Sequence, residues 1–598
     1  MCSNTFDGSR VVLAGLLWFG VVMYLRFTQR TNGDGSVTKY VALAHNRRVE
    51  GKVKPDVLMN LGRVDRLDVD GLRRLAASIT KHFGGDGLAM DVGTETGLAA
   101  GTAPIEVVDS RPLGTAWLLD ALWKRLEIAS AIKNAADGRR FTTDVERVLF
   151  ALVANRAIEP MSKWSAADWV TEDVTIPGLA MMDDDQAYRA MDLLVEADTA
   201  GAVQESVFFA VAHLLNLEVD LLFFDTTSTY FERDAEEDDT AEQHGFRKYG
   251  KSKDHRDDLP QIVIGLAVTR EGIPVRVWCW PGNTNDQSVL AEVKDDMRDW
   301  KLGRVITVVD RGFSSADNLA YLRRAGGHYI AGMRMRDGGA LVEAALSRQG
   351  RYQTVRDNLH VKEVRLDHAG DARFIICHNP EQAERDRHQR EQAIVRIEAE
   401  LEHIKAQRER DRKHRAQMSA KARERAEAAH VRAECALRDH PTLKRWIRQQ
   451  KSGRLVINRA KVKAEANLDG KYLLATSDPD LSAEDAALGH KNLLEAERGF
   501  RDLKSELLLR PIFHRLEHRI RAHVLICWLA LLLTRVAERE TGQSWRNVRR
   551  ETGRLKQVTL TGQAGTITQT TPLRPGQKAI YQALSISPPP RVSIFDPT

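Results

Sequence analysis

Cysteine is scarce in this chain of 598 residues, and no two cysteines form a C-x-x-C pair. The five cysteines lie far apart, at Cys2, Cys279, Cys377, Cys435 and Cys527. Disulfide-stabilised small domains and zinc ribbons need closely spaced cysteines, so this distribution argues against both classes. It fits a protein that works in a reducing compartment.

The chain also lacks an apolar run of the roughly 20 residues needed to cross a bilayer. Val11–Leu25 is almost wholly apolar but has 15 residues, and Val524–Leu533 has 10 and is typical of a buried core helix. Because Met23 offers a second start, we interpret residues 1–22 as an extension or a mis-assigned start and expect no membrane anchor. The composition, 43% hydrophobic and 29% charged, is that of a globular protein and excludes wholesale disorder and collagen-like structure.

A large net charge is missing as well, since the formal total is only +5. The total hides an uneven distribution. Residues 501–598 carry 16 Lys and Arg against 7 Asp and Glu, a balance of +9, whereas the first 500 residues have a balance of −4. A positive field at the C-terminal end favours contact with a polyanion such as nucleic acid. The length predicts two or more folded units, because single cores rarely exceed about 250–300 residues.

Residues 23–215 are predicted to form a mainly helical N-terminal region that binds DNA. Two strand-like runs around an Asn-Gly-Asp-Gly turn open this region as a hairpin. Apolar residues then recur at helical spacing over Trp117–Asn134, Thr143–Ile158 and Ala187–Leu217. No sharp helix-turn-helix signature is present, so a plain packing module is the alternative.

Residues 216–335 change to strand patterns, and we interpret them as the first part of a catalytic core. Three strands joined by hairpins are followed by a strand, a helix and another strand, which is the order of a ribonuclease H-like fold. The predicted strands are Leu221–Phe224 with Thr226–Phe231, Gln261–Thr269, Ile273–Trp280, Arg304–Val309 and Tyr329–Met333.

Residues 336–476 read as an insertion that contains strands and a helical hairpin. Glu381–His440 has no Gly or Pro, carries 15 basic and 13 acidic residues, and shows a coiled-coil seam that fails between Gln407 and Gln417. Residues 477–558 follow as the second part of the core, and residues 559–598 as a loosely ordered tail. The predicted fold class is therefore α/β: a ribonuclease H-like catalytic core interrupted by a β-strand plus long-helix insertion, with a mainly helical N-terminal region.

Asp225 and Asp310 each end an apolar strand. A strand end holds a carboxylate at the edge of a sheet, and two such acids on adjacent strands can share a divalent metal ion. With a third carboxylate they form a two-metal site for phosphoryl transfer. An isolated acid at a strand end is more often a turn or cap residue. This hypothesis therefore depends on the agreement between the positions of the two acids and the predicted strand order.

Three ordered blocks resemble the catalytic blocks of DDE-class insertion-sequence transposases, in the superfamily with a Tyr-Arg-Glu-Lys signature around its third acid. They are FFDTTSTYFE (Phe223–Glu232), VVDRGFSSADNLAYLRRAGGHYIAG (Val308–Gly332) and HKNLLEAERGFRDLKSELLLRPIFHRLEHRIRAH (His490–His523). Two further blocks are similar, YGKSKDHRDDLPQIVIGLAV (Tyr249–Val268) and PGNTND (Pro281–Asp286), so the resemblance covers nearly the whole chain.

The resemblance implies Mg²⁺-dependent cutting of element ends and joining of the freed 3′ hydroxyls to target DNA, with Mn²⁺ able to substitute. It implies that Asp225, Asp310 and Glu497 are the catalytic, metal-binding acids. Lys504 falls on the Lys of the signature, seven residues after Glu497, so both lie on one helical face and Lys504 can meet a phosphate near the metals. Arg501 lies on that face too.

Two signature positions differ from the superfamily. Its Tyr falls on His490, which can still stack on or hydrogen-bond to DNA, and its Arg falls on Leu493, which cannot bind a phosphate. In relatives these positions help hold flipped or hairpinned DNA ends. The sequence therefore makes no prediction of a hairpin intermediate.

A second candidate DNA contact is the segment FRKYGKSKDHR (Phe246–Arg256), which mixes basic and aromatic residues between the first two core strands. Basic side chains suit phosphates and aromatic rings suit bases. We therefore predict DNA contacts from Arg247, Lys248, Lys251 and Lys253. The alternative is a solvated charged loop, which the acidic Glu236–Asp239 just upstream favours.

His514 to His518 spells H-x-x-E-H, a zinc metallopeptidase pattern. No third ligand is evident, and a helix-surface or phosphate-facing histidine is the better interpretation.

Together these observations predict a DNA transposase that binds terminal inverted repeats and target DNA, acts as at least a homodimer, and works on DNA in the bacterial cytoplasm. A structure-selective nuclease on the same fold, an inactive DNA-binding relic and a zinc peptidase are the alternatives, in that order.

Overall fold

A computed structural model describes residues 23–31, 37–49, 52–64, 67, 105–135, 144–198, 201–233, 235–239, 244–300, 302, 304–336, 339–367, 372–562 and 565–596. The chain divides into two compact units, residues 1–102 and residues 103–598. The apolar run Val11–Leu25 lies almost wholly outside the described residues.

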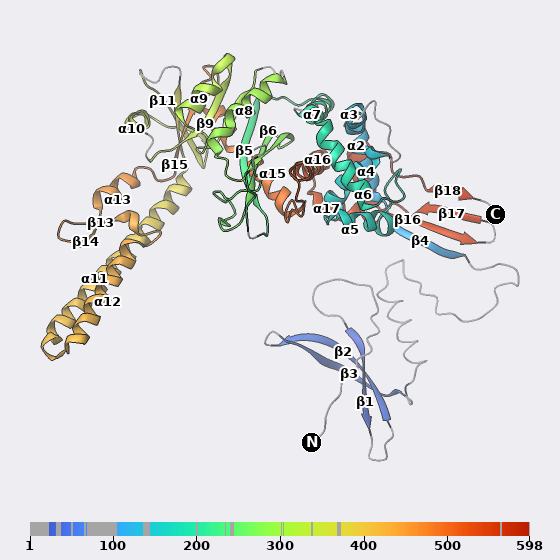
Figure 1. Cartoon of the computed structure of the whole chain (residues 1–598), viewed down its shortest axis with the longest axis horizontal. Helices are drawn as coiled ribbons and strands as arrows, with labels where there is room; N and C mark the ends of the chain where they lie inside the picture. Colours follow the sequence, from blue (N-terminus) through green and yellow to red (C-terminus); the bar gives the residue numbers. More distant parts are fainter. Residues whose placement is uncertain are drawn as a thin grey trace. The chain divides into compact units, whose positions relative to one another are not determined.

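The first unit contains one antiparallel sheet in the order β1-β2-β3 (Figure 1). The predicted hairpin is present, because β1 (Met23–Thr31) pairs with β2 (Val37–Val49) around the Asn-Gly-Asp-Gly segment. A third strand, β3 (Lys52–Arg63), then pairs with β2. Residues 60–215 were predicted to be mainly helical, and this is wrong at residues 60–63, which end β3. The pairing of β3 with β2 is a contact that helical periodicity does not reveal.

The second unit begins with strand β4 (Glu106–Pro112), and a group of helices follows it. Three helices were predicted here, over Trp117–Asn134, Thr143–Ile158 and Ala187–Leu217. The structure breaks two of them, so that the helices are α2 (Gly114–Arg125), α3 (Ile128–Ala135), α4 (Val145–Ile158), α5 (Lys163–Asp168), π-helical η2 (Trp169–Asp173), α6 (Asp184–Ala197) and α7 (Ala202–Leu214). Glu127, with a φ of 57°, separates the first two. Asp183 begins α6 with a capping box on Gln186.

A nine-stranded sheet in the order β10-β11-β12-β15-β9-β8-β5-β6-β7 forms the centre of the second unit. Its strands are β5 (Leu221–Tyr230), β6 (Gln261–Thr269), β7 (Pro274–Pro281), β8 (Ile306–Val309), β9 (His328–Met333), β10 (Gln353–Arg356), β11 (Leu359–Arg365), β12 (Arg373–His378) and β15 (Lys471–Thr476). β5, β6 and β7 are antiparallel neighbours, whereas β5, β8 and β9 are parallel. This is a mixed α/β fold with the predicted strand order.

Both faces of this sheet are buried, and alternate residues of β5 enter different cores. Leu221 and Phe223 belong to the core with α14 (Ala483–Lys491), α15 (Leu494–Ser505) and α16 (Glu517–Thr541). Leu222 and Phe224 belong to the other core, with α8 (Asp286–Asp299), α9 (Ala316–Leu322) and α10 (Gly339–Ser347). The near-continuous apolar character of β5 follows from this burial on two sides.

The segment between β9 and α14 adds four strands to one side of the sheet and carries the helical hairpin. Helices α11 (Pro380–His414) and α12 (Ala420–Arg438) lie side by side, joined near Ser419, which caps α12 (Figure 1). Ile394, Ile397 and Ile404 of the predicted seam are buried against Leu437 and Trp446. The remaining short elements are η4 (Arg324–Gly326), η5 (Arg415–Gln417), η6 (Lys444–Trp446), β13 (Ile447–Gln449), β14 (Leu455–Ile457) and α13 (Arg459–Ala466).

Helix α16 is a core helix. By length and composition alone it could cross a membrane, yet 94% of its most apolar window is buried inside the protein. It packs against α4, α6 and β7, so it joins the helical group to the sheet. Helix α15 packs on β5 and β6 from the same side.

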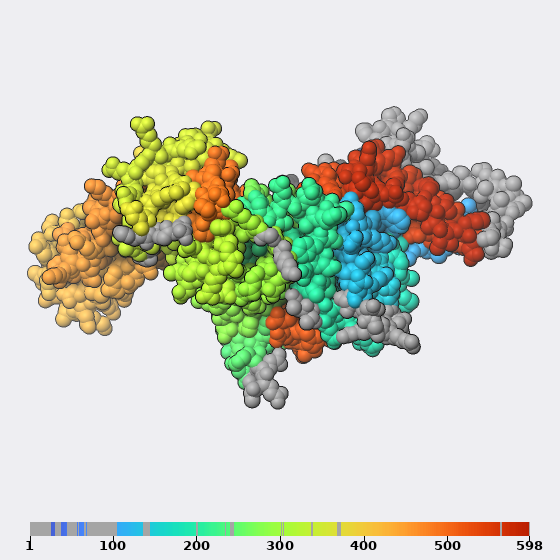
Figure 2. Space-filling model, turned by 90° about the horizontal axis from the view of Figure 1, so that it is seen from above, coloured from blue at the N-terminus to red at the C-terminus, as the bar shows by residue number. Residues whose placement is uncertain are grey.

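The prediction of a loosely ordered tail is wrong. Residues after α17 (Trp545–Thr552) form β16 (Lys556–Gly562), β17 (Gly565–Thr570), α18 (Pro575–Ala583) and β18 (Val592–Asp596). β16 pairs with β4 (Glu106–Pro112) in a four-stranded sheet, so the two ends of the unit meet (Figure 2). β4 is also a strand inside a region that was predicted to be mainly helical. The Thr- and Gln-rich composition of these segments does not indicate strands. No local pattern shows that their partner strand lies hundreds of residues earlier in the chain.

Gly282 allows the loop before β6 to dock on the sheet. A Cβ at Gly282 would lie 2.0 Å from the carbonyl oxygen of Gln261 and 2.2 Å from that of Lys248. We expect Gly282→Ala to lower the free energy of unfolding by about 1–3 kcal/mol, because backbone must move. Gly562→Ala is the matched control, since its nearest neighbour is Ile105 Cγ1 at 3.5 Å, and it should change stability by less than about 0.5 kcal/mol. Urea unfolding of both variants measures this, and equal effects would contradict the docking role.

Glu363 on β11 holds Arg373 on β12, with Nε and Nη2 donating to its two oxygens at 3.0 and 2.8 Å. Arg373 Nη1 also donates to the carbonyl oxygens of Asp478 and Leu481, both at 2.7 Å, in the segment that leads into α14. The hydrogen bonds that Glu363 accepts from Arg373 lower the pKa of the Glu363 carboxyl from 4.5 to about 2.

We expect Glu363→Gln to cost about 2 kcal/mol of unfolding free energy at pH 7, the value of charged hydrogen bonds. Because the folded-state pKa is depressed, this stabilisation is complete above pH 4.5 and is lost as the pH falls toward about 2. The difference from wild type in urea unfolding should therefore narrow between pH 5 and pH 3. Glu381→Gln removes an exposed pair with Arg385 and should show no such trend.

Candidate active site

Asp225 and Asp310 lie next to each other on one face of the central sheet. The parallel pairing of β5 with β8 matches Phe224 with Val309, so the residues that follow them, Asp225 and Asp310, stand at the same level. Asp225 continues the alternation of Leu221 and Phe223, and therefore shares their face, the one that α14 and α15 cover. The register brings the two acids to one level, as expected, but Asp225 lies within the ten-residue β5, so the prediction that it ends a strand is wrong and only Asp310 follows the end of its strand.

Glu497 reaches this region from α15. Ala496, Gly499, Phe500 and Leu503 are the buried face of the helix, and Glu497 lies beside that face and is exposed. A Cβ at Gly499 would lie 2.8 Å from Cδ2 of Leu266, the residue that pairs with Asp225 across β5 and β6. Glycine therefore brings the helix close to the strand that neighbours Asp225.

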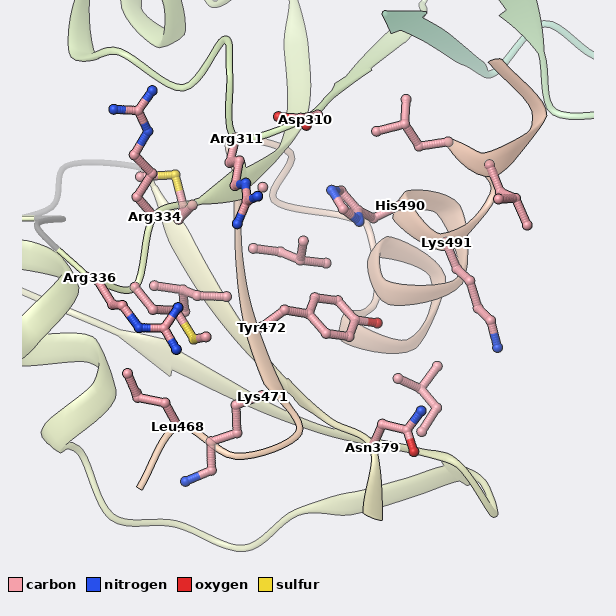
Figure 3. Close-up of a pocket in the computed structure, with 18 of the residues that line it drawn as sticks. Asp310, Arg311, Arg334, Arg336, Asn379, Leu468, Lys471, Tyr472, His490 and Lys491 are labelled. Atoms are coloured by element: carbon pink, nitrogen blue, oxygen red, sulfur yellow. The ribbon is translucent and has the colours of Figure 1, made fainter. Parts of the chain in front are cut away.

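Asp310 and Glu497 line one cavity of about 940 Å³ (Figure 3). Its walls come from the ends of β8, β9 and β15 and from α14 and α15. Basic side chains surround it: Arg311, Arg334, Arg336, Lys471 and Lys491. Arg311 and Arg334 are exposed, and within the described ranges neither forms an ion pair. The cavity thus combines two of the predicted acids with a positive lining.

A fourth acid, Asp286 at the start of α8, stands beside Asp225. The Thr226 hydroxyl donates to Asp286 Oδ1 at 2.6 Å, and Lys253 Nζ lies 3.3 Å from Asp286 Oδ2 and 3.9 Å from Asp225 Oδ1. A Cβ at Gly312 would lie 3.4 Å from Asp310 Oδ1 and 3.9 Å from Asp286 Oδ2, so these two carboxylates border the same small space. Lys253 is the cation among these carboxylates.

Burial raises the pKa of Asp225 from 3.8 to about 6. The positive charge of Lys253 and the Thr226 N–H, 2.7 Å from Oδ1, act in the opposite direction, whereas Asp310 and Asp286 raise the pKa further by like-charge repulsion. Asp310 accepts a hydrogen bond from the Gly312 N–H. Closely placed, partly desolvated carboxylates are a common property of metal-binding and catalytic sites.

The donors suit a hard divalent cation such as Mg²⁺, because every candidate ligand is a carboxylate oxygen. Across the residues whose placement is described, however, no group of three or more His, Cys, Asp or Glu residues is arranged to hold a metal ion. Asp225 and Asp310 are neighbours on the sheet, Asp310 and Glu497 share a cavity wall, and Lys253 lies against Asp225 and Asp286.

His490 lines the same cavity as Asp310 and is partly buried (Figure 3). Its ring stacks on Tyr472, with centroids 6.1 Å apart, and Nε2 has no hydrogen-bond partner among the described residues. Burial lowers its pKa from 6.5 to about 4, although the charge of Asp310 opposes this. A Cβ at Gly332 would lie 3.1 Å from Nε2, so this glycine makes room for the ring. The neutral ring lines the cavity, and Leu493, at the other altered position, is buried in the core.

Lys504 binds a carboxylate inside the protein. Its Nζ lies 3.0 Å from both oxygens of Asp254, and Arg510 Nη1 lies 2.7 Å from the same carboxylate. These pairs tie the end of α15 to the loop between β5 and β6. Arg501, one turn after Glu497, is exposed and forms no ion pair in the described part of the chain.

The four basic side chains predicted to contact DNA from the loop before β6 differ in their partners and in their exposure. Arg247 pairs with Glu237, its Nε donating at 2.7 Å, and Lys248 Nζ lies 2.9 Å from Asp239. Both are buried, so DNA contact would require these pairs to open. Lys251 is exposed and, among residues with a described placement, unpaired. Lys253, as described above, points into the acidic cluster.

The H-x-x-E-H residues do not converge on one point. Glu517 accepts from Arg521 at 2.8 Å, His518 Nε2 lies 3.2 Å from Asp192, and His514 precedes α16 and faces His523. The geometry agrees with the interpretation of this motif as a chance match.

Asp286 and Asp254 are the residues of this region that sequence reasoning missed as site residues. Asp286 ends the PGNTND block and Asp254 follows Lys253, so both lay inside segments already compared with transposases. The only available signal was membership of those blocks. Their spatial partners, Thr226 and Lys504, come from distant elements.

Two family models match this chain. The family model described as the IS1634 family transposase N-terminal domain matches residues 25–89. The Transposase DDE domain matches residues 220–533. No curated protein matches the chain. One similar solved structure is a piggyBac transposase synaptic complex with hairpin DNA, at 10% identity and a TM-score of 0.33, covering 73% of this chain and 79% of that one.

The matched DDE domain begins just before β5, ends within α16, and covers more than half of the chain. It therefore contains Asp225, Asp310 and Glu497, the last two of which line the cavity. On these grounds the chain belongs to the DDE transposases of insertion sequences, enzymes that cleave DNA and transfer its strands.

Proposed function

We propose that this transposase cuts the ends of its insertion sequence and joins them to target DNA by two-metal phosphoryl transfer at Asp225, Asp310 and Glu497. The observation that carries the assignment is the register of β5 and β8, which sets Asp225 and Asp310 side by side on the face that α15 covers. Glu497 lines the same cavity as Asp310 and completes the acid set. Lys504 in the same helix supports membership of the Tyr-Arg-Glu-Lys superfamily.

The three carboxylates would hold Mg²⁺, for which Mn²⁺ can substitute. DDE transposase domains generally use divalent metal ions, and carboxylate oxygens are the ligands that Mg²⁺ prefers. When bound, such ions activate the attacking oxygen and stabilise the leaving oxygen. Water first breaks a phosphodiester at the element end and releases a 3′ hydroxyl. That hydroxyl then attacks a target phosphodiester and displaces a target 3′ oxygen.

DNA would reach the acids over basic side chains that form no ion pair with the described residues. Arg501 follows Glu497 by one helical turn, Lys251 lies on the loop before β6, and Arg311 and Arg334 line the cavity. His490 presents its ring and an unpartnered Nε2 to the same cavity. Exposed, unpaired cations attract a phosphate backbone without having to break an internal ion pair.

The proposed partners are the terminal inverted repeats and the target DNA, and the proposed assembly is a homodimer that holds two ends together. The proposed location is the bacterial cytoplasm, on DNA. We further propose that residues 336–476 are an insertion in a ribonuclease H-like core, because they lie between β9 and the helices that bear His490 and Glu497. The N-terminal region would supply additional DNA contacts.

Two alternative functions are compatible with the same fold: a structure-selective nuclease that cuts DNA without joining it, and an inactive relic that binds element ends without cutting them. A labelled element-end duplex incubated with Mg²⁺ and a target plasmid separates them. Joined product supports strand transfer, nicked DNA alone supports the nuclease, and bound but uncut DNA supports the relic.

Neutral variants of the acids test the site. We expect Asp225→Asn, Asp310→Asn and Glu497→Gln each to slow cutting and joining by about a thousandfold or more, because each removes several kcal/mol of transition-state stabilisation. DNA binding in a gel shift should persist. Glu506→Gln, an exposed acid at the end of α15, should keep full activity. A triad variant that cuts at the wild-type rate would refute the assignment.

Arg501→Gln tests the DNA path. We expect weaker binding to the element end and a salt dependence of log Kd that is shallower by about one, the effect of losing one phosphate contact. Arg498→Gln is the control on the same helix, because Arg498 Nη2 already donates to Glu538 at 3.1 Å. Equal salt slopes for the two variants would show that Arg501 does not contact phosphate.

A further inference from the structure

The ammonium group of Lys253 lies against the acidic cluster, although the side chain is partly open to solvent. Its Nζ donates to the Thr226 carbonyl oxygen at 2.7 Å and to Thr226 Oγ1 at 2.6 Å. It lies 3.3 Å from Asp286 Oδ2 and 3.9 Å from Asp225 Oδ1. The contact with Asp225 is therefore the longest of the four.

The Thr226 hydroxyl closes this network. It donates its one proton to Asp286 Oδ1 at 2.6 Å, so its lone pair is free to accept from Lys253. Strand β5, the loop before β6 and the start of α8 each supply one member. Three elements that are distant in sequence thus hold the ammonium in one place.

The backbone around Lys253 is also anchored. The Lys253 N–H donates to Ser228 Oγ at 2.9 Å, and the Ser252 N–H donates to Asp257 Oδ1 at 2.7 Å. The next residue, Asp254, is the carboxylate that Lys504 and Arg510 hold. Lys253 is therefore presented by a fixed loop, and its side chain is 37% exposed.

The charges explain why a cation is needed at this place. Asp225, Asp286 and Asp310 are mutually close, and like charges in a partly buried site repel each other. Lys253 is the one positive group that the described residues place against Asp225, and it lies on the side of the carboxylate where Asp286 also stands. It offsets part of this repulsion within the folded protein.

We propose that Lys253 is a resident counter-cation of Asp225, which a divalent metal ion must displace from the carboxylate when it binds. The Lys253–Asp225 contact is given up, and the shorter contacts to Thr226 and Asp286 keep the ammonium beside the site. Lys253 is thus a positioning residue that steadies Asp225 without metal and weakens metal binding by charge repulsion. This inference rests on the proposed metal site.

Mn²⁺ binding to the full-length protein, measured by titration calorimetry without DNA, tests the proposal. We expect Lys253→Met to bind Mn²⁺ about tenfold more tightly, the change that corresponds to one pKa unit of interaction. Lys253→Arg, which keeps the charge, should stay close to wild type. Lys251→Met, an exposed lysine of the same loop, should leave the Mn²⁺ affinity unchanged.

Thermal unfolding gives a second readout. Without metal, Lys253→Met should melt at a lower temperature than wild type, and saturating Mn²⁺ should raise its melting temperature by more. A merely structural role of Lys253 predicts the opposite change in affinity, because a damaged site binds metal more weakly. If Lys253→Met does not fold, Lys253→Gln replaces it, since glutamine keeps donors for the Thr226 oxygens.

Unchanged or weaker Mn²⁺ binding by the neutral variants would overturn the proposal. Asp225→Ala separates this failure from failure of the metal site itself. If wild type binds Mn²⁺ and Asp225→Ala does not, the site stands and only the role of Lys253 is at stake. If Asp225→Ala binds like wild type, the proposed site is wrong and the inference falls with it.

Discussion

The parallel, in-register pairing of β5 with β8 is the constraint on which the site depends. Four residue pairs, from Leu221 with Ile306 to Phe224 with Val309, bring Asp225 and Asp310 to one level. Because side chains alternate along a strand, a slip of one residue would turn one acid to the opposite face. Burial of both faces penalises such a slip, since apolar residues of β5 fill a core on each side. Packing of the two cores therefore fixes the register that places Asp225 beside Asp310.

Helix α15 completes the arrangement from above the sheet. Its approach depends on Gly499, which lies over Leu266, the strand partner of Asp225. Its far end is held by the pairing of Lys504 with Asp254, next to Lys253. The Lys504–Asp254 ion pair thus links α15, which carries Glu497, to the loop that carries Lys253, the cation beside Asp225. A change in either element is felt by the other.

Strand positions in the core could be predicted because β-branched and apolar runs bounded by turns are a local signal. Gln261–Thr269 was predicted with the bounds that β6 has. The helical hairpin could be predicted because its seam and its lack of Gly and Pro are local too. The C-terminal strands could not, because β16 is stabilised by pairing with β4, which lies hundreds of residues earlier. Threonine-rich segments of this kind look like linkers until their partner is known.

The sequence by itself determined the residue types, their order and the family, because ordered blocks around Asp225, Asp310 and Glu497 are local patterns. Only the tertiary structure decided which charges are free. Arg247, Lys248 and Lys504 look like DNA contacts in the sequence, yet each binds an internal carboxylate. Lys253, one of the same basic run, faces Asp225 and Asp286. The reason is that a side chain's partner depends on its neighbours in space, and these come from strands, loops and helices far apart in the chain.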